Sequence, residues 1–293
     1  MLVEIQIFEV GPRDGFQNIC DYIPVETKLK IIDKLVDAGI QHMQITSFVS
    51  PKAIPQMRDA KEIVEICLKK YPTLDLFALV PNLRGAQMAY ETGLKKVTNV
   101  ISLSESHNRA NINRSREQSL EELERILHTY PQLEVCVDIA TVFGCPFEGD
   151  LGIVALLDFL QNLYEKGIRL FNICDTIGVA HPKQVREIIK KVLEIYPDCT
   201  FQIHIHDTRN MGMVNTLAAI ECGITEVQST LGGLGGCPFA PGASGNTATE
   251  DLVYMLEKMG YETNINFQKL LDLSKWQTTI IQGNYSGHHI HIK

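Results

Sequence analysis

The chain has 293 residues, of which 45% are hydrophobic and 21% are charged, and this composition is typical of an ordinary globular protein. The net charge of −8 and the lack of a long Lys/Arg cluster exclude nucleic acid and an anionic membrane surface as expected partners. The first residues lack the basic region of a signal peptide, and no segment approaches the roughly 20 apolar residues that a membrane span needs. Eight scattered cysteines without a CxxC pair indicate reduced thiols and a cytoplasmic protein.

Short β-branched segments alternate with amphipathic segments along the chain, and this change of hydrophobic period predicts strands and helices in turn. We expect strands at residues 3–9, 41–46, 74–80, 96–102, 133–140, 168–174, 200–206 and 225–229. A helix should follow each strand, at residues 25–38, 57–70, 82–92, 117–129, 152–166, 182–195, 209–222 and 247–259. Pro182 and Asn246 stand where helices begin, and glycines stand just past the ends of others, at Gly39, Gly93, Gly167, Gly223 and Gly260.

Eight strand–helix pairs in one chain of this length predict an α/β fold, a (β/α)8 TIM barrel with a short C-terminal helical extension. A doubly wound sheet, the rival fold, usually has a glycine-rich phosphate turn after its first strand, whereas "GPRDGFQN" follows that strand here. We assign residues 1–280 to one catalytic barrel domain. The end of the chain, 281–293, is histidine-rich and is left open as a disordered tail or an expression remnant, without a catalytic role.

The segment "FQIHIHDT" places His204 and His206 two residues apart in a predicted strand, so both imidazoles face the same side. A barrel collects functional residues at the C-terminal ends of its strands, where Asp14 and Asn246 join the two histidines. Two nitrogen and two oxygen ligands suit Mg²⁺ or Mn²⁺, with Zn²⁺ as the less favoured choice. Each residue also has a purely structural explanation: hydrogen-bonded core histidines, a turn aspartate and a helix N-cap asparagine.

Other polar residues are expected at the same end of the barrel. Arg13 stands beside Asp14, and its permanent charge can hold a carboxylate or a developing oxyanion. Gln44 ends the second strand, and Asp175 follows the sixth. Cys237 lies in a loop rich in glycine and proline, where its thiol could transfer a proton when the loop closes or could simply pack as a small apolar residue.

Six motifs follow one another along the chain: "EVGPRDGFQN" (9–18), "TSFVSPKAIPQM" (46–57), "GCPFEG" (144–149), "DTIGVA" (175–180), "HIHDT" (204–208) and "STLGGLGGCPFAPGASGNTATEDLVYML" (229–256). In this order they resemble the 3-hydroxy-3-methylglutaryl-CoA lyases, which belong to a wider group of metal-dependent lyase and Claisen-synthase barrels. The last motif is the most specific, and the shorter "RDG" and "HxHD" elements are shared with the synthases. The resemblance covers nearly the whole chain.

The resemblance implies a divalent cation, Mg²⁺ or Mn²⁺, held by the four ligands predicted above. It implies that the enzyme cleaves a 3-hydroxyacyl-CoA by a retro-Claisen reaction to acetyl-CoA and a keto acid, as in leucine degradation. Arg13 would then face the enolate oxygen, Cys237 would donate a proton, and His204 would be a further catalytic residue. The substrate-binding candidates are Arg13, Gln17, His107 and Asp175.

Three positions depart from the family pattern. Gln44 replaces a glutamate, His107 stands where an aromatic residue is more usual, and Asp138 stands where a neutral residue is expected. Strand alternation directs Asp138 into the barrel, so we expect it to supply the negative charge lost at Gln44, paired with His107 or with a substrate group. We count Gln44 and Asp138 among the catalytic candidates.

These departures leave the substrate open. A related lyase or synthase for another acyl-CoA, such as citramalyl-CoA, would use the same chemistry, and a barrel that binds a CoA ester without turnover is a further alternative. A homodimer is expected only by analogy with similar barrels.

Overall fold

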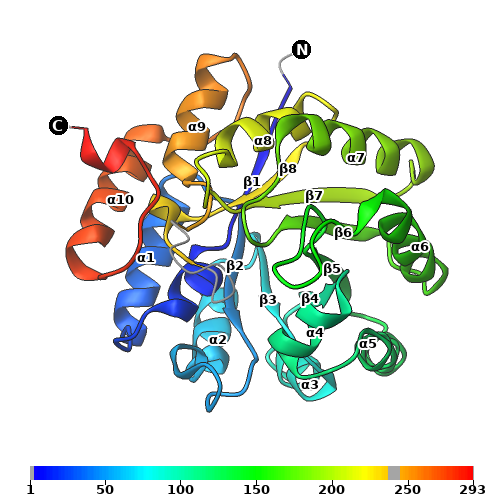
Figure 1. Ribbon diagram of the computed structural model, residues 1–293. Helices are drawn as coiled ribbons and strands as arrows, with labels where there is room; N and C mark the ends of the chain where they lie inside the picture. Colours follow the sequence, from blue (N-terminus) through cyan, green and yellow to red (C-terminus); the bar gives the residue numbers. More distant parts are fainter. Residues whose placement is uncertain (1–2, 237–244, 293) are drawn as a thin grey trace.

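Eight parallel strands close into a barrel in the order β1 to β8, as predicted (Figure 1). The computed structural model describes residues 3–236 and 245–292. Each strand agrees with its predicted range to within two residues at both ends, except that the first begins three residues later. The strands are β1 (Gln6–Glu9), β2 (His42–Ser47), β3 (Asp75–Leu79), β4 (Lys96–Ser102), β5 (Glu134–Ala140), β6 (Leu170–Asp175), β7 (Thr200–Ile205) and β8 (Glu226–Ser229).

A layer of helices surrounds the barrel (Figure 1). The predicted helices are α1 (Val25–Asp37), α2 (Ala60–Lys70), α3 (Leu83–Glu91), α5 (Arg116–Thr129), α6 (Gly152–Glu165), α7 (Pro182–Ile195), α8 (Gly212–Ile220) and α9 (Thr249–Lys258). Two more are α4 (Glu105–Ile112), which was not predicted, and α10 (Phe267–Ile280), which is the expected C-terminal extension. Among the described residues, none of the helices combines the length and the apolar character that crossing a membrane requires.

Local sequence signals set several helix ends. Pro182 occupies the first turn of α7, where its missing N–H costs no hydrogen bond. Gly39 follows α1 with a φ of +106°, and a Cβ at this position would lie 2.6 Å from the Asn264 carbonyl oxygen. The helix start predicted at Asn246 is wrong, because α9 begins at Thr249 and Asn246 is turned toward the barrel mouth instead.

Alternation along β5 separates two environments. Val135, Val137 and Ile139 belong to the apolar core between the strands and the helices. Asp138 lies on the opposite, interior face, as predicted, and lines a cavity inside the barrel. Buried polar side chains need hydrogen-bond partners, and neighbouring strands supply them here, as in the bond from Asn172 Nδ2 to Asp138 Oδ1 at 3.0 Å.

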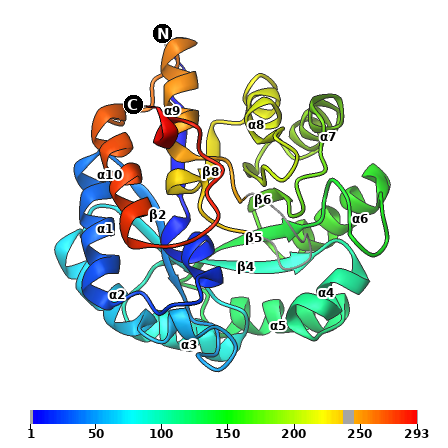
Figure 2. The ribbon, with the colours of Figure 1, turned by 60° about the vertical axis from the view of Figure 1, so that its left-hand side comes forward.

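After α10 the chain returns to the mouth of the barrel (Figure 2). The backbone N–H groups of His288 and His289 donate to the Asp251 carboxylate at 2.7 and 3.0 Å. Ser286 donates to the backbone carbonyl of Asn246. The segment that the sequence left open as a disordered tail is therefore packed over 284–292, because α9 and the loop before it offer acceptors.

One ion pair is buried between α1 and the segment that leads into α2. Lys28 Nζ lies 2.7 Å from Asp59 Oδ2 and also donates to the Gln56 carbonyl oxygen. Tyr22 donates to the same Asp59 oxygen at 2.8 Å. Both charged side chains are at most 5% exposed, so each depends on the other for compensation of its lost hydration.

Replacing Lys28 by methionine keeps most of the side-chain volume and leaves the Asp59 carboxylate without its cation. We expect the free energy of unfolding to fall by about 3–5 kcal/mol, measured by urea denaturation. The matched control is Lys70→Met, because Lys70 pairs with Asp33 at the same 2.7 Å but is 52% exposed, and its loss should be much smaller. Equal losses in the two variants would contradict this account.

Candidate active site

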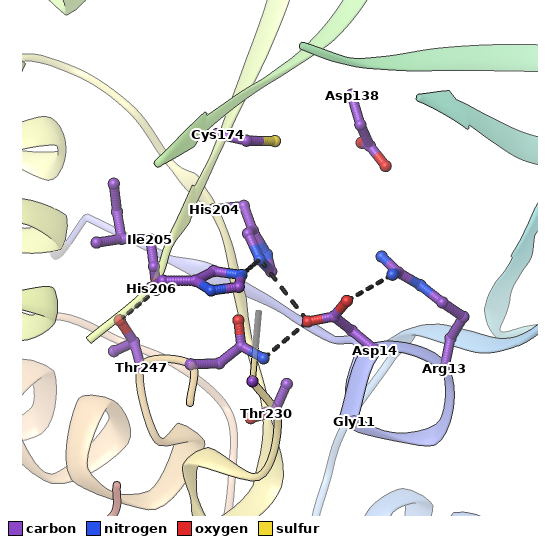
Figure 3. A network of polar contacts seen from close by, with 12 residues as sticks. Gly11, Arg13, Asp14, Asp138, Cys174, His204, Ile205, His206, Thr230 and Thr247 are labelled. Atoms are coloured by element: carbon purple, nitrogen blue, oxygen red, sulfur yellow. Dashed lines mark hydrogen bonds and ion pairs between the residues drawn. The ribbon is translucent and has the colours of Figure 1, made fainter. Parts of the chain in front are cut away.

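Three buried side chains converge at the C-terminal mouth of the barrel (Figure 3). Asp14, His204 and His206 each offer one ligand atom, and these atoms lie within 4.8 Å of one another. The two histidine Nε2 atoms are 3.0 Å apart, and His204 Nε2 lies 3.9 Å from Asp14 Oδ2. The sequence prediction that the two histidines face one side of their strand is thus confirmed.

The turn after β1 positions Asp14. Residues Gly11–Gly15 form one π-helical turn, and the backbone N–H of Asp14 donates to the Val10 carbonyl at 2.7 Å. The Glu9 carboxylate accepts the N–H of Gly11 at 2.7 Å, and a Cβ on Gly11 would lie only 2.5 Å from that oxygen. A side chain here would have to displace this hydrogen-bonded carboxylate oxygen, which favours glycine.

Asn246 completes the set of predicted ligands. An isolated bridge pairs its backbone with that of His206, and its Nδ2 donates to Asp14 Oδ2 at 2.8 Å. Its Oδ1 is buried and has no hydrogen-bond partner among the described residues. An orphaned amide oxygen beside a carboxylate and two facing imidazoles fits a divalent cation, because two Nε2 atoms can share only one proton between them.

The electrostatics of the three residues favour the metal-binding forms. Burial alone would raise the pKa of Asp14, but Arg13 and the two histidines hold it at about 2. Burial lowers the pKa of His204 to about 3 and also lowers the pKa of His206. A carboxylate and two neutral imidazoles are the protonation states that a cation needs.

Arg13 is fixed between two partners. Its Nη1 donates to Asp14 Oδ1 at 2.6 Å, and its Nε donates to the Gln44 side-chain oxygen. Gln44 is fully buried and does not line the cavity, so it supports Arg13 from behind. The guanidinium lines the cavity, and these two hydrogen bonds fix the orientation of its plane.

The cavity at this site has a volume of about 220 Å³. Its lining combines the metal candidates with several polar groups from other strands. The predicted residues that it brings together are Arg13, Asp14, Gln17, His107, Asp138, His204 and His206. Gln17 also donates to Asp14 Oδ1 at 2.8 Å, so it steadies the candidate ligand.

Two more of the predicted residues, Asp175 and Cys237, are not among those that the structure places in the cavity lining. Asp175 does not line the cavity: its carboxylate accepts the N–H groups of Val179 and Ala180, each at 3.0 Å, and so orders the loop after β6. Its role in substrate binding stays a prediction. Cys237 lies outside the described residues, although Gly236 next to it lines the cavity.

The structure also adds residues that the sequence did not single out. Asn172 lines the cavity from β6 and bonds Asp138, and Thr98 of β4 accepts a hydrogen bond from Gln44 Nε2 at 2.6 Å. Asparagine in the apolar strand "LFNICD" was the available signal for Asn172. His107 bonds the Ser102 hydroxyl at 2.6 Å through Nδ1, and burial lowers its pKa to about 4.

Comparisons with known proteins agree with this geometry. The HMGL-like family model matches residues 4–276. The hydroxymethylglutaryl-CoA lyase YngG of Bacillus subtilis is 42% identical over 93% of this chain and 92% of its own, and the human mitochondrial hydroxymethylglutaryl-CoA lyase is 39% identical over 92% and 83%. An HMG-CoA lyase from Acinetobacter baumannii, solved in complex with coenzyme A and 3-methylmalate, superposes with a TM-score of 0.92 at 36% identity, covering 97% of this chain and 93% of that one.

Removal of one candidate ligand should weaken cation binding directly. We expect His206→Ala to lower the affinity for Mn²⁺ by more than roughly tenfold, the size of effect that even outer-shell changes produce at metal sites. Isothermal titration calorimetry with MnCl₂ measures this without any substrate. The control is His42→Ala, because His42 pairs with Asp75 at the opposite end of the barrel. Unchanged affinity in His206→Ala would rule out the assigned ligand set.

Proposed function

This chain belongs to the HMGL-like family, the family of the hydroxymethylglutaryl-CoA lyases, and we propose that it cleaves 3-hydroxy-3-methylglutaryl-CoA to acetyl-CoA and acetoacetate with the help of a divalent cation. One observation carries the proposal. Asp14, His204 and His206, all buried, converge beside Arg13 on one cavity, and this chemistry needs a cation and a fixed positive group at the same place.

We propose Mg²⁺ or Mn²⁺ as the cation, because the ligand set contains carboxylate and amide oxygens and two imidazoles, and no thiolate among the described residues. Asp14, His204, His206 and Asn246 would hold it. When bound, the cation supplies Lewis-acid chemistry that lowers the pKa of a coordinated hydroxyl group.

Arg13 acts on the charge that develops during cleavage. When the bond between C2 and C3 of the acyl chain breaks, the electron pair moves onto the thioester and gives an enolate oxygen. The Arg13 guanidinium lies in the cavity wall with its orientation fixed by Asp14 and Gln44. A preorganised donor stabilises this oxygen more than it stabilises the ground state, and so it lowers the barrier.

Cys237 is our proposed proton donor to the enolate carbon, which completes acetyl-CoA. The support is its place in the chain, since Gly236 immediately before it borders the cavity. His204 remains a second candidate for moving a proton at this site.

The cavity is sized for an acyl group alone. Its volume of about 220 Å³ is below the roughly 300–1,000 Å³ of pockets that hold drug-sized ligands. A larger cleft of about 780 Å³ lies beside it, between the loop after β1 and the end of α10, and Gly236 lines both. We propose that the acyl chain enters the cavity and that the coenzyme A portion lies in this cleft.

A second candidate function is a lyase or synthase for another acyl-CoA, such as citramalyl-CoA. The observation that favours it is the polar wall of the cavity at Asp138 and Asn172. The Acinetobacter baumannii relative in complex with 3-methylmalate also supports a family cavity that receives a branched hydroxy diacid.

We also propose a reducing compartment such as the cytoplasm and a step in leucine degradation. The seven cysteines within the described residues are free thiols, which supports the first point. A homodimer stays a prediction, which light scattering would test.

Product analysis separates these functions. The purified protein with Mg²⁺ or Mn²⁺ is given 3-hydroxy-3-methylglutaryl-CoA and citramalyl-CoA in separate reactions, and mass spectrometry follows the products. We expect acetyl-CoA and acetoacetate from the first. Pyruvate from the second alone would move the specificity to citramalyl-CoA. Bound metal without either product would favour another acyl-CoA or a barrel that binds without turnover.

Replacing Arg13 by methionine removes the donor aimed at the enolate oxygen. We expect kcat to fall by about 10²–10³, the usual cost of one such donor. Arg169→Met serves as the control, since Arg169 bonds Asp198 on the exposed surface. If kcat survived in Arg13→Met while the melting temperature was unchanged, the enolate would have to be stabilised by another group.

A further inference from the structure

A chain of hydrogen bonds runs across the barrel interior from Arg13 to Asp138. Arg13 Nε donates to the Gln44 side-chain oxygen, and Gln44 Nε2 donates to Thr98 Oγ1 at 2.6 Å. The Thr98 hydroxyl in turn acts as a side-chain donor that lowers the pKa of Asp138. Four elements, the turn after β1 and strands β2, β4 and β5, are thereby connected inside the barrel.

The direction of every bond in this chain is fixed. A guanidinium nitrogen can only donate, so the oxygen of the Gln44 amide must face Arg13 and its NH₂ group must face Thr98. The Thr98 hydroxyl then accepts from Gln44, and its single proton is left for Asp138. The amide at Gln44 thus makes Thr98 a donor to the Asp138 carboxylate.

Asp138 and Asn172 together form an accepting wall of the cavity. Asn172 Nδ2 donates to Asp138 Oδ1 at 3.0 Å, which turns Asn172 Oδ1 away from the carboxylate. That amide oxygen is buried, the residue is 1% exposed, and the oxygen has no hydrogen-bond partner in the described part of the chain. Both residues line the cavity, and Asp138 lies across from Arg13 (Figure 3). Such a wall recognises a hydrogen-bond donor.

The acyl chain of the proposed substrate offers one such donor at neutral pH. Its distal carboxylate, its thioester and its methyl group carry no O–H or N–H, so the 3-hydroxyl is the only group that can satisfy this wall. We propose that Asp138, held by Gln44 through Thr98, accepts the proton of the 3-hydroxyl group and is a catalytic residue of this enzyme. This inference rests on the proposed function.

The step balances without any additional reactant. The 3-hydroxyl proton passes to a carboxylate oxygen of Asp138, and the O–H electron pair forms the ketone C=O. The bond between C2 and C3 breaks, and its electron pair becomes the thioester enolate. The enolate carbon takes one proton, proposed from Cys237, and the proton on Asp138 returns to the thiolate through solvent.

Gln44 and Asp138 therefore act as a pair. A glutamate at position 44 would accept the Thr98 proton itself and would leave Asp138 without that donor. Two carboxylates linked through one hydroxyl would also raise each other's pKa. In this chain the negative charge lies on the fifth strand, at Asp138, and the second strand contributes the neutral amide of Gln44.

The surroundings suit Asp138 to proton transfer near neutral pH. Burial raises its pKa to about 6, and Arg13, Asn172 and Thr98 oppose a larger rise. The titratable or charged groups that face it from its own strand and from the neighbouring elements are Cys136, Cys174, Arg13, Asp14, His204 and His107. The active form is the carboxylate, so kcat should rise with pH through about 6 and level off above it.

The first test is Asp138→Asn in the full chain with Mn²⁺. We expect kcat for 3-hydroxy-3-methylglutaryl-CoA to fall by about 10²–10⁴, with the acid limb of the pH profile lost and Mn²⁺ affinity kept. The control is Asp75→Asn, the same substitution on β3 at the opposite end of the barrel, where Asp75 pairs with Lys96. It should keep kcat and the acid limb.

The second test exchanges the two positions. Gln44→Glu alone should lower kcat, because it takes the Thr98 proton from Asp138. The double variant Gln44→Glu/Asp138→Asn should be at least roughly tenfold faster than Asp138→Asn, which is a positive coupling that a merely structural role would not give. Thr98→Val should move the acid limb to a pH above 6, because the Asp138 carboxylate loses a donor that lowers its pKa. The hydrogen bond from Asn172 still holds the Asp138 side chain in place.

Two outcomes would overturn the inference. One is kcat within about twofold of the unmodified protein in folded Asp138→Asn, and the other is a loss confined to KM. If Asp138→Asn does not fold, Thr98→Val decides, and an unmoved acid limb overturns the inference. A failure of the proposed function looks different, because the unmodified protein would then release no acetoacetate.

Discussion

The site depends on the buried carboxylate of Glu9. It accepts hydrogen bonds from the N–H groups of Gly11 and Leu231 and from the Thr249 hydroxyl, and so ties the end of β1 to the segment after β8 and to the first residue of α9. Burial raises its pKa to about 7, and these three donors limit the rise. Glu9 thereby holds the turn that carries Arg13 and Asp14 in a fixed position relative to the residues on either side of Asn246.

The closed parallel barrel supplies the remaining geometry. Strand ends meet at one mouth, so His204 of β7 and His206 just after that strand reach Asp14 in the turn after β1 without any long loop. Inside the barrel, side chains from β2, β4, β5 and β6 are joined by bonds of defined direction. Such an interior has few arrangements that satisfy all its donors and acceptors, which makes it rigid and sensitive to single amide-for-acid changes.

The sequence was sufficient for features that follow from period and spacing. Hydrophobic period placed the strands and most helices, and alternation placed Asp138 inside the barrel, because a strand has only two faces. The metal candidates were found because two histidines at that spacing share a face. Helix α4 was missed because it is mostly polar, with His107 and Asn108 as its buried residues, so it has little apolar period.

Features that depend on contacts across the barrel could not be predicted. The local sequence around Asn246 predicts an N-cap, but its side chain donates to Asp14 across the barrel mouth instead. Asp175 differs, because its carboxylate accepts N–H groups of its own loop, and its role in substrate binding stays a prediction. The partner of Gln44 is another example, because a glutamine in an apolar strand does not reveal which arginine or threonine it faces.

The packing of 284–292 has a consequence for the order of assembly during synthesis. Ser286 and Gly287 bond the carbonyls of Asn246 and Gly232, which support the mouth from behind. These residues leave the ribosome after every strand of the barrel has emerged. A nascent barrel can therefore close while the backing of the candidate cation site is still missing, and competence for chemistry should come later than the fold itself.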